Sequence, residues 1–371
     1  MTGTHLRQHA LPAVKSIVVK VGTNALCGPD GQLDNAAVES LCAQLLELRE
    51  RGLEVTLVAS GAVGAGMAEL GLTERPTAVP QLQAVAAVGQ RVLMQAFGQR
   101  LSPAGLHVGQ VLVTAEDFPE HARFLNIRNT LLSLHSLGVL PIINENDATA
   151  VYELRYGDND LIAAHVAAML SADALVLLTT VDAVLDNGRP LDVIAEVNDE
   201  TMLLVEDSKS ALGSGGMGTK LQAAKLAIRT GGIAVIANAR EERILLRLLD
   251  GETLGTVFVP ADRKLSSRRR WLAGPSKPEG HIRVDAGAAN ALLDGGKSLL
   301  AIGITAAEGE FSKGDVVCVL DPAGAEIARG LTNYAACDLA KIIGQRSEMF
   351  EQILGESPYD EVVHRDNLVL V

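Results

Sequence analysis

Short runs of apolar, mostly β-branched residues recur along the chain and predict strands. Most of these runs are continuous rather than alternating, as in parallel strands that are buried on both faces. Between them apolar residues recur at helical spacing, as at Val38, Leu41, Leu45 and Leu48. This alternation predicts a doubly wound α/β sheet, whose ligands bind outside the carboxyl ends of the strands. The predicted strands are Ser16–Val21, Val55–Ala59, Val111–Thr114, Val139–Ile143, Ala174–Thr179 and Ile233–Ala237, and the predicted helices are Ala36–Arg51, Gln81–Arg100, Asn126–Leu137, Asp160–Leu170 and Lys220–Thr230.

The pattern changes near residue 260. The stretch DRKLSSRRRWLAGPSKPEG is basic and then rich in Pro and Gly, which is typical of a linker. Short β-like pieces follow it at Ser298–Ile304, Asp315–Leu320 and Glu326–Leu331. We therefore expect a large domain over residues 1–262, a linker over residues 263–280 and a small β-rich domain over residues 281–371.

Composition narrows the class of protein. The length of 371 residues suits about two domains, and the formal net charge of −13 disfavours a general binder of nucleic acid or anionic membranes. The four cysteines form no CxxC pair, no apolar run reaches ~18 residues, and the N-terminus lacks the apolar core of a signal peptide. We expect a cytoplasmic protein without a membrane span, and we assign no residues as metal ligands.

Small amides and carboxylates follow one predicted strand in the stretch PIINENDATAVYELRYGDND, residues 141–160. Turn formation alone favours such residues, but their place beyond a buried strand also suits a site for a polar or cationic ligand.

Three glycine-rich segments adjoin strands or helices: VVKVGTNAL, VASGAVGAGM and GSGGMGTKLQAAK. Small residues let backbone N–H groups approach an anion, and a helix N-terminus favours negative charge. In the third segment, Thr219-Lys220 follows the last glycine where a Walker A loop has Lys-Ser/Thr, so a Walker A loop is rejected. A dinucleotide fingerprint is disfavoured because the polar stretch VEDSKSAL, not a strand, precedes the glycines.

Together these segments resemble the glutamate 5-kinases of the amino acid kinase family, which carry a C-terminal PUA domain. The resemblance covers nearly the whole chain and includes VVKVGTN, ASGAVGAG, LQAVAAVGQRVLM, FLNIRNTLLSLHSLGVLPIINENDA, GDND and GSGGMGTK in the family's order. It implies an α/β fold, a three-layer αβα sandwich with a mainly parallel sheet, plus a small PUA-like domain. It also implies transfer of the ATP γ-phosphate to the side-chain carboxylate of L-glutamate with Mg²⁺, on the way to proline.

The resemblance assigns roles to individual residues. The catalytic residues would be Lys20, Asp160 and Lys220, and the glutamate-binding residues Ser60, Asn144, Asp147 and Asn159. The nucleotide-binding residues would be Lys20, Gly22, Thr179, Thr180, Ser214, Gly215, Gly216, Met217, Gly218, Thr219 and Lys220. These roles suit the chemistry, because an ionised carboxylate needs no general base and the barrier lies in charge and positioning.

The chain departs from the family after the strand Ala174–Thr179. Thr180 replaces the usual acid, and Ala183-Val184-Leu185 stands where Gly-Leu-Tyr is common. This departure puts the nucleotide pocket in doubt more than the glutamate pocket. The family's proline feedback acts near the glutamate pocket, and sensitivity to proline cannot be read from these residues.

Three functions remain open. The leading one is a glutamate 5-kinase, and the others are another amino acid kinase, acting on N-acetylglutamate, aspartate or carbamate, and a non-catalytic protein that binds glutamate, proline or RNA. From His281 on, seven Lys/Arg stand against fourteen Asp/Glu, so RNA binding by this domain is disfavoured. The resemblance further implies a homodimer or homotetramer.

Overall fold

The computed structural model describes residues 3–28, 31–150, 159–198, 201–202, 216–260, 278–294, 296–355 and 359–370. Most of the expected linker lies outside these ranges. The chain divides into two compact units, one of Met1–Asp117 and Thr130–Lys264 and the other of Phe118–Asn129 and Leu265–Val371. No helix in the described part of the chain is long and apolar enough to cross a membrane.

An eight-stranded sheet forms the centre of the first unit, in the order β3-β4-β2-β1-β5-β9-β10-β8. The strands from β3 to β9 in this order pair in parallel, and β10 is antiparallel to β9. Their bounds are β1 Ser16–Val21, β2 Glu54–Ala59, β3 Val108–Val113, β4 Leu140–Glu145, β5 Ala174–Thr179, β8 Val193–Ile194, β9 Ile233–Asn238 and β10 Thr256–Phe258, with a small hairpin of β6 Leu185–Asp186 and β7 Arg189–Pro190.

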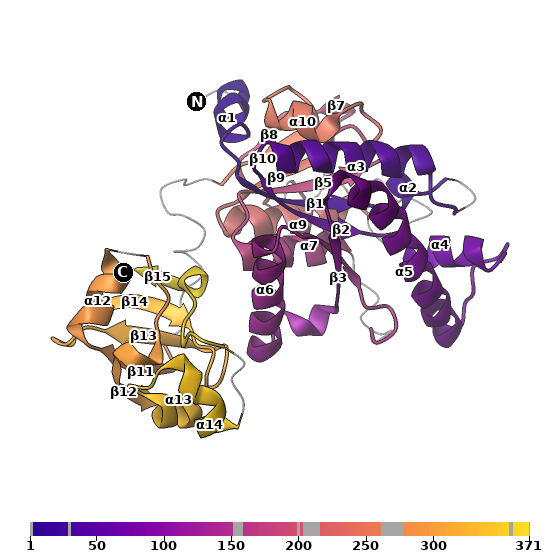
Figure 1. Ribbon diagram of the computed structural model, residues 1–371. Coiled ribbons are helices and arrows are strands. Elements are labelled where there is room, and N and C mark those ends of the chain that lie inside the picture. Colours follow the sequence, from indigo (N-terminus) through magenta and orange to yellow (C-terminus); the bar gives the residue numbers. More distant parts are fainter. Residues whose placement is uncertain are drawn as a thin grey trace. The chain divides into compact units, whose positions relative to one another are not determined.

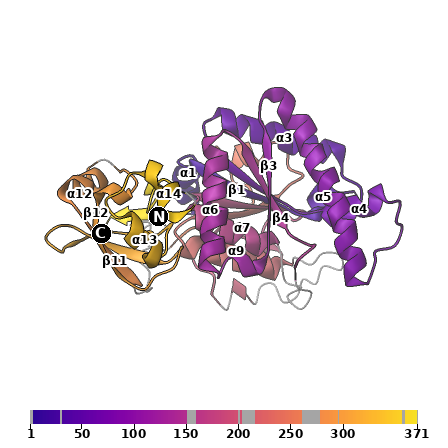
Figure 2. The same ribbon diagram turned by 60° about the horizontal axis from the view of Figure 1, so that its bottom comes forward.

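Helices cover both faces of this sheet, so the unit has three layers (Figures 1 and 2). Helices α3, α5 and α10 lie on one face, and α7 and α9 pack against β1, β5 and β9 on the other. The helices are α1 Gly3–Ala10, α2 Thr23–Leu26, α3 Asn35–Glu50, α4 Ala62–Glu69, α5 Val79–Leu101, α6 His121–Ser136, α7 Asn159–Leu170, α9 Met217–Arg229 and α10 Ile244–Leu249, with 3-10 turns at Ser102–Ala104 and Ala115–Asp117.

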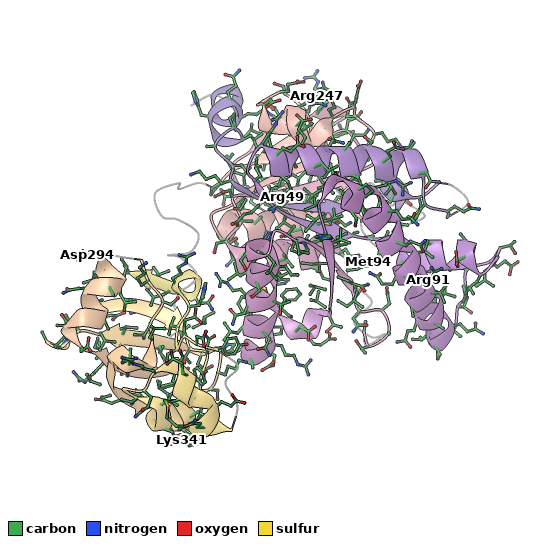
Figure 3. All side chains as sticks on the ribbon, in the orientation of Figure 1. Arg49, Arg91, Met94, Arg247, Asp294 and Lys341 are labelled. Carbon is green, nitrogen blue, oxygen red and sulfur yellow. The ribbon has the colours of Figure 1, made fainter. Side chains whose placement is uncertain are left out.

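The continuous apolar runs explain why the sheet is buried on both faces. Successive side chains of a strand point to opposite faces, so Ile17 and Val19 of β1 join the core under α3 and α5. Val18 lies between them, is also fully buried, and points to the face covered by α7. Met94 of α5, labelled in Figure 3, packs against the core under α3 and α5.

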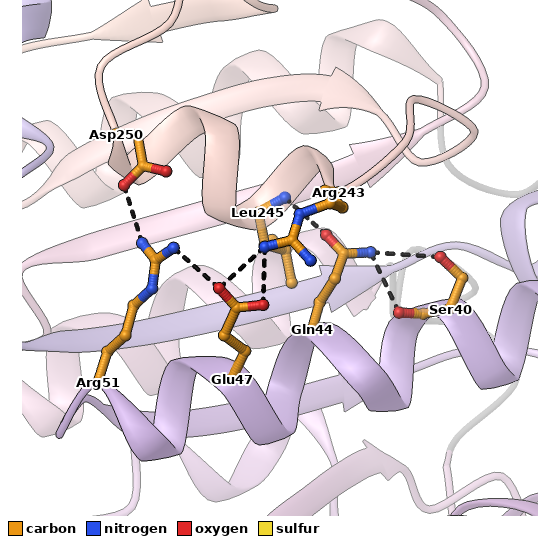
Figure 4. Close-up of polar contacts among 7 residues, drawn as sticks. All are labelled: Ser40, Gln44, Glu47, Arg51, Arg243, Leu245 and Asp250. Carbon is orange, nitrogen blue, oxygen red and sulfur yellow. Dashed lines mark hydrogen bonds and ion pairs between the residues drawn. The ribbon is translucent and has the colours of Figure 1, made fainter.

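Polar contacts fasten α10 to α3 (Figure 4). Glu47 of α3 pairs with Arg243 at 2.8 Å and with Arg51 at 2.9 Å, and Arg51 also pairs with Asp250. The buried Gln44 accepts a hydrogen bond from the backbone N–H of Leu245 at 2.9 Å. This bond satisfies one of the N–H groups that a helix leaves open in its first turn.

The N-terminal helix is anchored by one arginine. Arg7 is fully buried and pairs with Asp192 at 2.7 Å. Its guanidinium also donates to the carbonyl oxygens of Glu252, Leu254 and Gly255. A buried guanidinium needs several acceptors, so α1 is held to the loops that precede β8 and β10.

The second unit contains a five-stranded sheet in the order β12-β11-β13-β14-β15 with its own hydrophobic core. Its elements are β11 Gly280–Val284, α12 Ala286–Leu293, β12 Ile304–Gly309, β13 Val316–Leu320, β14 Glu326–Leu331, α13 Ala336–Ile342, α14 Phe350–Leu354 and β15 Leu368–Leu370, with 3-10 turns at Ala301–Gly303, Ser347–Met349 and Arg365–Asn367. The strand expected at Ser298–Ile304 was wrong. Leu299 forms only an isolated bridge with Val363, and β12 begins at Ile304.

The first part of α6 belongs to this second unit. Leu125 is fully buried in a cluster with Leu331 and Val369. Asn129 donates to Asn333 at 3.3 Å and accepts from Asn367 at 3.2 Å. The unit is therefore built from two stretches that are far apart in the sequence.

Candidate active site

Polar residues from distant segments meet at one edge of the first unit's sheet. The strands β1, β2, β4 and β5 run parallel, so their carboxyl ends share this edge. Lys20 lies near the end of β1, Ser60 directly follows β2, Asn144 lies near the end of β4, and Thr179 ends β5. The sequence predicted this convergence from the strand pattern.

A buried carboxylate at the start of α7 joins the two lysines. Asp160 is fully buried, and its Oδ1 lies 2.6 Å from Lys20 Nζ. Its Oδ2 lies 2.9 Å from Lys220 Nζ and accepts from Thr219 Oγ1 at 3.3 Å. Both lysines are themselves less than a tenth exposed, Lys20 at 4% and Lys220 at 7%. The structure thus brings together the three residues that the sequence predicted as catalytic.

The two lysines keep Asp160 ionised. Burial raises the pKa of its carboxyl, but the charges and hydrogen bonds of Lys20 and Lys220 outweigh burial and hold the pKa below its ordinary value. The cluster has two cations and one anion and so carries a net positive charge. Such a charge suits an anionic ligand.

Three of the four predicted glutamate-binding residues form one hydrogen-bonded cluster. Asn159 Nδ2 donates to Ser60 Oγ at 2.8 Å and to Asn144 Oδ1 at 2.9 Å. Both of its hydrogens are therefore used, and its Oδ1 is buried without a hydrogen-bond partner in the described part of the chain. The cluster offers this oxygen as an acceptor.

Asp147, the fourth predicted residue, lies half-buried in the turn after β4. Burial raises the pKa of its carboxyl, and the charge of Arg75 opposes this rise. A half-buried carboxylate with a raised pKa gains from a cationic partner, since the charge of the partner favours the charged form of the carboxyl.

Glycine and small residues line the predicted nucleotide loops. Gly216 caps the N-terminus of the 13-residue helix α9, with Thr219 Oγ1 donating to its carbonyl oxygen at 2.8 Å. No heavy atom comes within 4 Å of a Cβ built on Gly218, so that side of the helix start is open. Gly22 follows β1 beside Lys20, while Thr180 is exposed. Ser214 and Gly215 lie outside the described residues.

A cavity of about 270 Å³ opens beyond the ends of β5 and β9. Its lining includes Asp182, Ala183, Asn238, Leu254 and Gly255. Asn238 ends β9, and its Nδ2 donates to Asp182 Oδ1 at 2.7 Å. The sequence did not single out Asn238, although its position at a strand end was a usable signal.

Comparison with known families accounts for both units. The sequence pattern of the PUA domain matches residues 280–354, and that of the amino acid kinase family matches residues 15–237. The chain belongs to the amino acid kinase family.

The relatives of this amino acid kinase extend over its full length. A glutamate 5-kinase of Methylococcus capsulatus is 46% identical over 98% of this chain and 99% of its own. One of Rhodopirellula baltica is 43% identical over 98% of this chain and 96% of its own. Among solved structures, a carbamate kinase from Giardia lamblia bound to AMP-PNP matches with a TM-score of 0.48 at 21% identity, covering 67% of this chain and 99% of that one.

Amino acid kinases use ATP, which is accompanied by a divalent metal ion. In the described part of this amino acid kinase, no three His, Cys, Asp or Glu side chains gather in a metal-binding group. Asp160 already shares its two oxygens with Lys20 and Lys220. The described residues therefore form no protein-held Mg²⁺ site, and phosphate oxygens of the nucleotide are ordinary ligands for such an ion.

Proposed function

We propose that this chain transfers the γ-phosphoryl group of ATP to the side-chain carboxylate of L-glutamate. The product is L-glutamyl 5-phosphate, and the reaction is the first step of proline biosynthesis. One observation carries the proposal: Lys20 and Lys220 pair with the buried Asp160. They do so at the sheet edge where Ser60, Asn144 and Asn159 form the hydrogen-bonded amide cluster. Relatives at 43% and 46% identity that are glutamate 5-kinases support the choice of substrate.

The reaction needs charge stabilisation rather than a base. The γ-carboxylate of glutamate is ionised near neutral pH and is itself the nucleophile. It forms a bond to the γ-phosphorus while the bond from that phosphorus to the β,γ-bridging oxygen breaks, and ADP leaves. Lys20 and Lys220 supply positive charge for the moving phosphoryl group, and Asp160 holds the two ammonium groups in place.

Backbone N–H groups supply the remaining donors for the phosphates. The first N–H groups of α9 have no partner within the helix, and the helix dipole adds positive potential at Gly216 to Gly218. A glycine at position 218 leaves room for a phosphate to approach the backbone.

The amide cluster and Asp147 recognise the amino acid. Asn159 Oδ1 accepts from the α-ammonium group, and Asp147 contributes a negative charge to it. Ser60 Oγ accepts from Asn159, so its own proton is free to donate to a substrate carboxylate. A substrate with a free ammonium group fits this polarity better than an N-acetylated one.

The cavity beyond β5 and β9 receives the base of the nucleotide. It lies at the same sheet edge as the lysines, and the Asp182–Asn238 pair offers polar atoms at its mouth. With Asp182→Ala, the KM for ATP is expected to rise about fivefold while the KM for L-glutamate stays unchanged. Equal changes in both constants would remove this assignment.

Trapping of the acyl phosphate tests the proposed reaction. Hydroxylamine converts an acyl phosphate into a hydroxamate, which is measured with ATP, Mg²⁺ and either L-glutamate or N-acetyl-L-glutamate. Hydroxamate is expected from free L-glutamate alone and is lost in Lys220→Ala. Hydroxamate from N-acetyl-L-glutamate alone would assign another amino acid kinase activity. Its absence from both, in folded protein, would favour a binding role.

The proposal extends to the organisation of the chain. Residues 1–262, apart from Phe118–Asn129, form the catalytic domain. Residues 281–371 form a PUA-like domain that serves assembly or regulation rather than RNA binding. A homodimer or homotetramer completes the proposal, and proline is tested as a feedback ligand of the glutamate pocket. Sedimentation with and without proline, together with a gel shift on structured RNA, measures each of these points.

A further inference from the structure

A buried glutamine of α5 extends the polar cluster at the strand ends. Gln90 is 8% exposed, and its Oε1 accepts a hydrogen bond from Asn144 Nδ2 at 2.8 Å. Its own Nε2 is buried and has no hydrogen-bond partner in the described part of the chain. Unpartnered buried amide groups are rare, and this one lacks an acceptor among the described residues.

We propose that Gln90 is a positioning residue of the glutamate site. It fixes the amide of Asn144 and, through Asn144, the atoms that Asn159 and Ser60 present to the amino acid. The inference rests on the proposed function, because it concerns how the same pocket recognises L-glutamate.

The order of donors and acceptors carries this inference. The backbone N–H of Glu145 donates to Asn144 Oδ1 at 2.9 Å, which turns Asn144 Nδ2 toward Gln90. Asn144 is thereby clamped at both ends of its amide, and its Oδ1 also accepts from Asn159 Nδ2. With that donor used, Asn159 has only its Oδ1 left for a ligand.

The backbone around Gln90 is held by a close helix contact. A Cβ built on the neighbouring Gly89 would lie 1.8 Å from the carbonyl oxygen of Ala62, the first residue of α4. A Cβ on Gly66 of α4 would lie 1.9 Å from the carbonyl oxygen of Val85. Ala62 comes two positions after Ser60. The helix α5 therefore contacts the segment whose Ser60 is also bonded to Asn159.

Loss of Gln90 should therefore disturb glutamate recognition selectively. Without the acceptor, Asn144 Nδ2 becomes an unpaired buried donor, and the amide gains by turning toward water. Asn159 then loses its fixed orientation, whereas Lys20, Asp160 and Lys220 keep their mutual bonds. Residues that orient a binding group typically change affinity by about tenfold or more when they are removed.

Gln90→Met tests the proposal against Gln99→Met, an exposed glutamine of the same helix. Steady-state assays measure the KM for L-glutamate, the KM for ATP and kcat, and thermal unfolding measures stability. For Gln90→Met we expect the KM for L-glutamate to rise about tenfold, with the KM for ATP and kcat within about twofold. Gln99→Met should leave all three within about twofold of the wild type.

A second background isolates the route through Asn144. Asn144→Ala leaves no side-chain amide to bond with Gln90, so Gln90→Met should add less than about twofold to the KM for L-glutamate in that background. The same rise in both backgrounds would overturn the route, as would an unchanged KM in Gln90→Met alone. A joint rise of both KM values with loss of stability would show a merely structural role. If Gln90→Met does not fold, Gln90→Ala replaces it. If the wild type forms no hydroxamate from L-glutamate, the proposed function fails, whatever the result for Gln90.

Discussion

Asp160 is the residue on which the charge balance of the site depends. It is fully buried, and each of its carboxylate oxygens pairs with one lysine. Burying three charges is costly, and the ion pairs offset that cost only while all three groups are present. The carboxylate thus supplies the opposite charge for both ammonium groups.

Replacement of this carboxylate should therefore stop the reaction without removing its bulk. For Asp160→Asn we expect kcat to fall at least about a hundredfold, because the two lysines repel each other and lose their positions. The hydroxamate assay measures kcat, with Asp186→Asn in the β6–β7 hairpin as the control. A kcat within about tenfold of the wild type would contradict this role for Asp160.

His135 makes the stability of the first unit depend on pH. Burial and the charge of Arg49 lower the pKa of its imidazole to about 4, and its Nε2 lies 2.9 Å from Thr56 Oγ1. The unfolded chain takes up a proton near pH 6.5, whereas the folded chain does so only near pH 4. The stabilisation is therefore complete above pH 6.5 and is lost as the pH falls from 6.5 to about 4, by on the order of 2–3 kcal/mol.

His135→Gln should flatten this pH dependence, because its amide can still bond to Thr56 but does not titrate. Urea unfolding at several values between pH 7 and pH 4 measures the free energy, with the exposed His107→Gln as the control. An unchanged slope in His135→Gln, or an equal effect in His107→Gln, would contradict the assignment.

The resemblance predicted the cluster of Lys20, Asp160 and Lys220 in more detail than the cluster of Ser60, Asn144 and Asn159. A lysine at a strand end and an Asp at a helix start are visible in the sequence, and the structure joins Lys20, Asp160 and Lys220. The sequence does not show whether the amide of Asn159 offers a donor or an acceptor to a ligand. The resemblance assigned Asn159 to glutamate without saying which of its atoms meets the ligand. Both of its N–H donors bond within the protein, so it presents an acceptor. Gln90 was missed because an amide inside an apolar helix carries no spacing signal.

At the scale of elements, the contact of α4 with α5 depends on two glycines. Gly66 and Gly89 let the backbones meet closer than any side chain permits. Because α4 starts directly after Ser60 and Gly61, this contact also fixes the loop that reaches the amide cluster.

Gly89→Ala should separate these helices and weaken both stability and glutamate binding. We expect a loss of about 2–3 kcal/mol in the free energy of unfolding and a raised KM for L-glutamate. In the control Gly98→Ala on the same helix, the new Cβ meets no heavy atom closer than 3.8 Å, so a gain of up to about 1 kcal/mol is expected. Urea unfolding compares the two, and equal stability would contradict the role of the contact.

The apolar pattern predicted long, buried elements better than short ones. The structure has β1 and β5 at the predicted bounds, and α7 begins only one residue early, because each combines a continuous apolar run with a clear boundary. By contrast, the three-residue β10 and the two-residue β8 are too short to show a period. The strand β12 escaped notice because its sequence ITAAEG lacks bulky residues.

At the scale of the whole molecule, the second unit has its own hydrophobic core, in which Tyr334 and Phe350 pack against each other. The segment Phe118–Asn129, which contains the first turns of α6, adds Leu125 to a separate cluster of the same unit. Periodicity predicted a helix only from Asn126 on, so it missed the first turns of α6 and their membership of the second unit, since apolar spacing does not say which partner a helix face meets.

Leu125→Ala should loosen the second unit. The side chain is fully buried, so a loss of about 2–4 kcal/mol is expected from the transfer and cavity costs. Leu137→Ala, which removes a side chain that is 75% exposed just beyond the end of α6, should change stability by less than about 0.5 kcal/mol. Hydrogen exchange of the β14 and β15 amides measures the effect, and equal protection in both variants would contradict it.

The bond between Asn129 and Asn333 forms only after a delay during synthesis of the chain, because its partners are 204 residues apart in the sequence. At about 5–20 residues per second, a ribosome needs roughly 10–40 s to travel between them. During that interval the nascent segment Phe118–Asn129 has no Leu331 or Val369 to cover Leu125. The early helix must therefore wait for β15, which supplies Val369. A ribosome that stalls before this strand leaves an apolar surface open to chaperones and proteases.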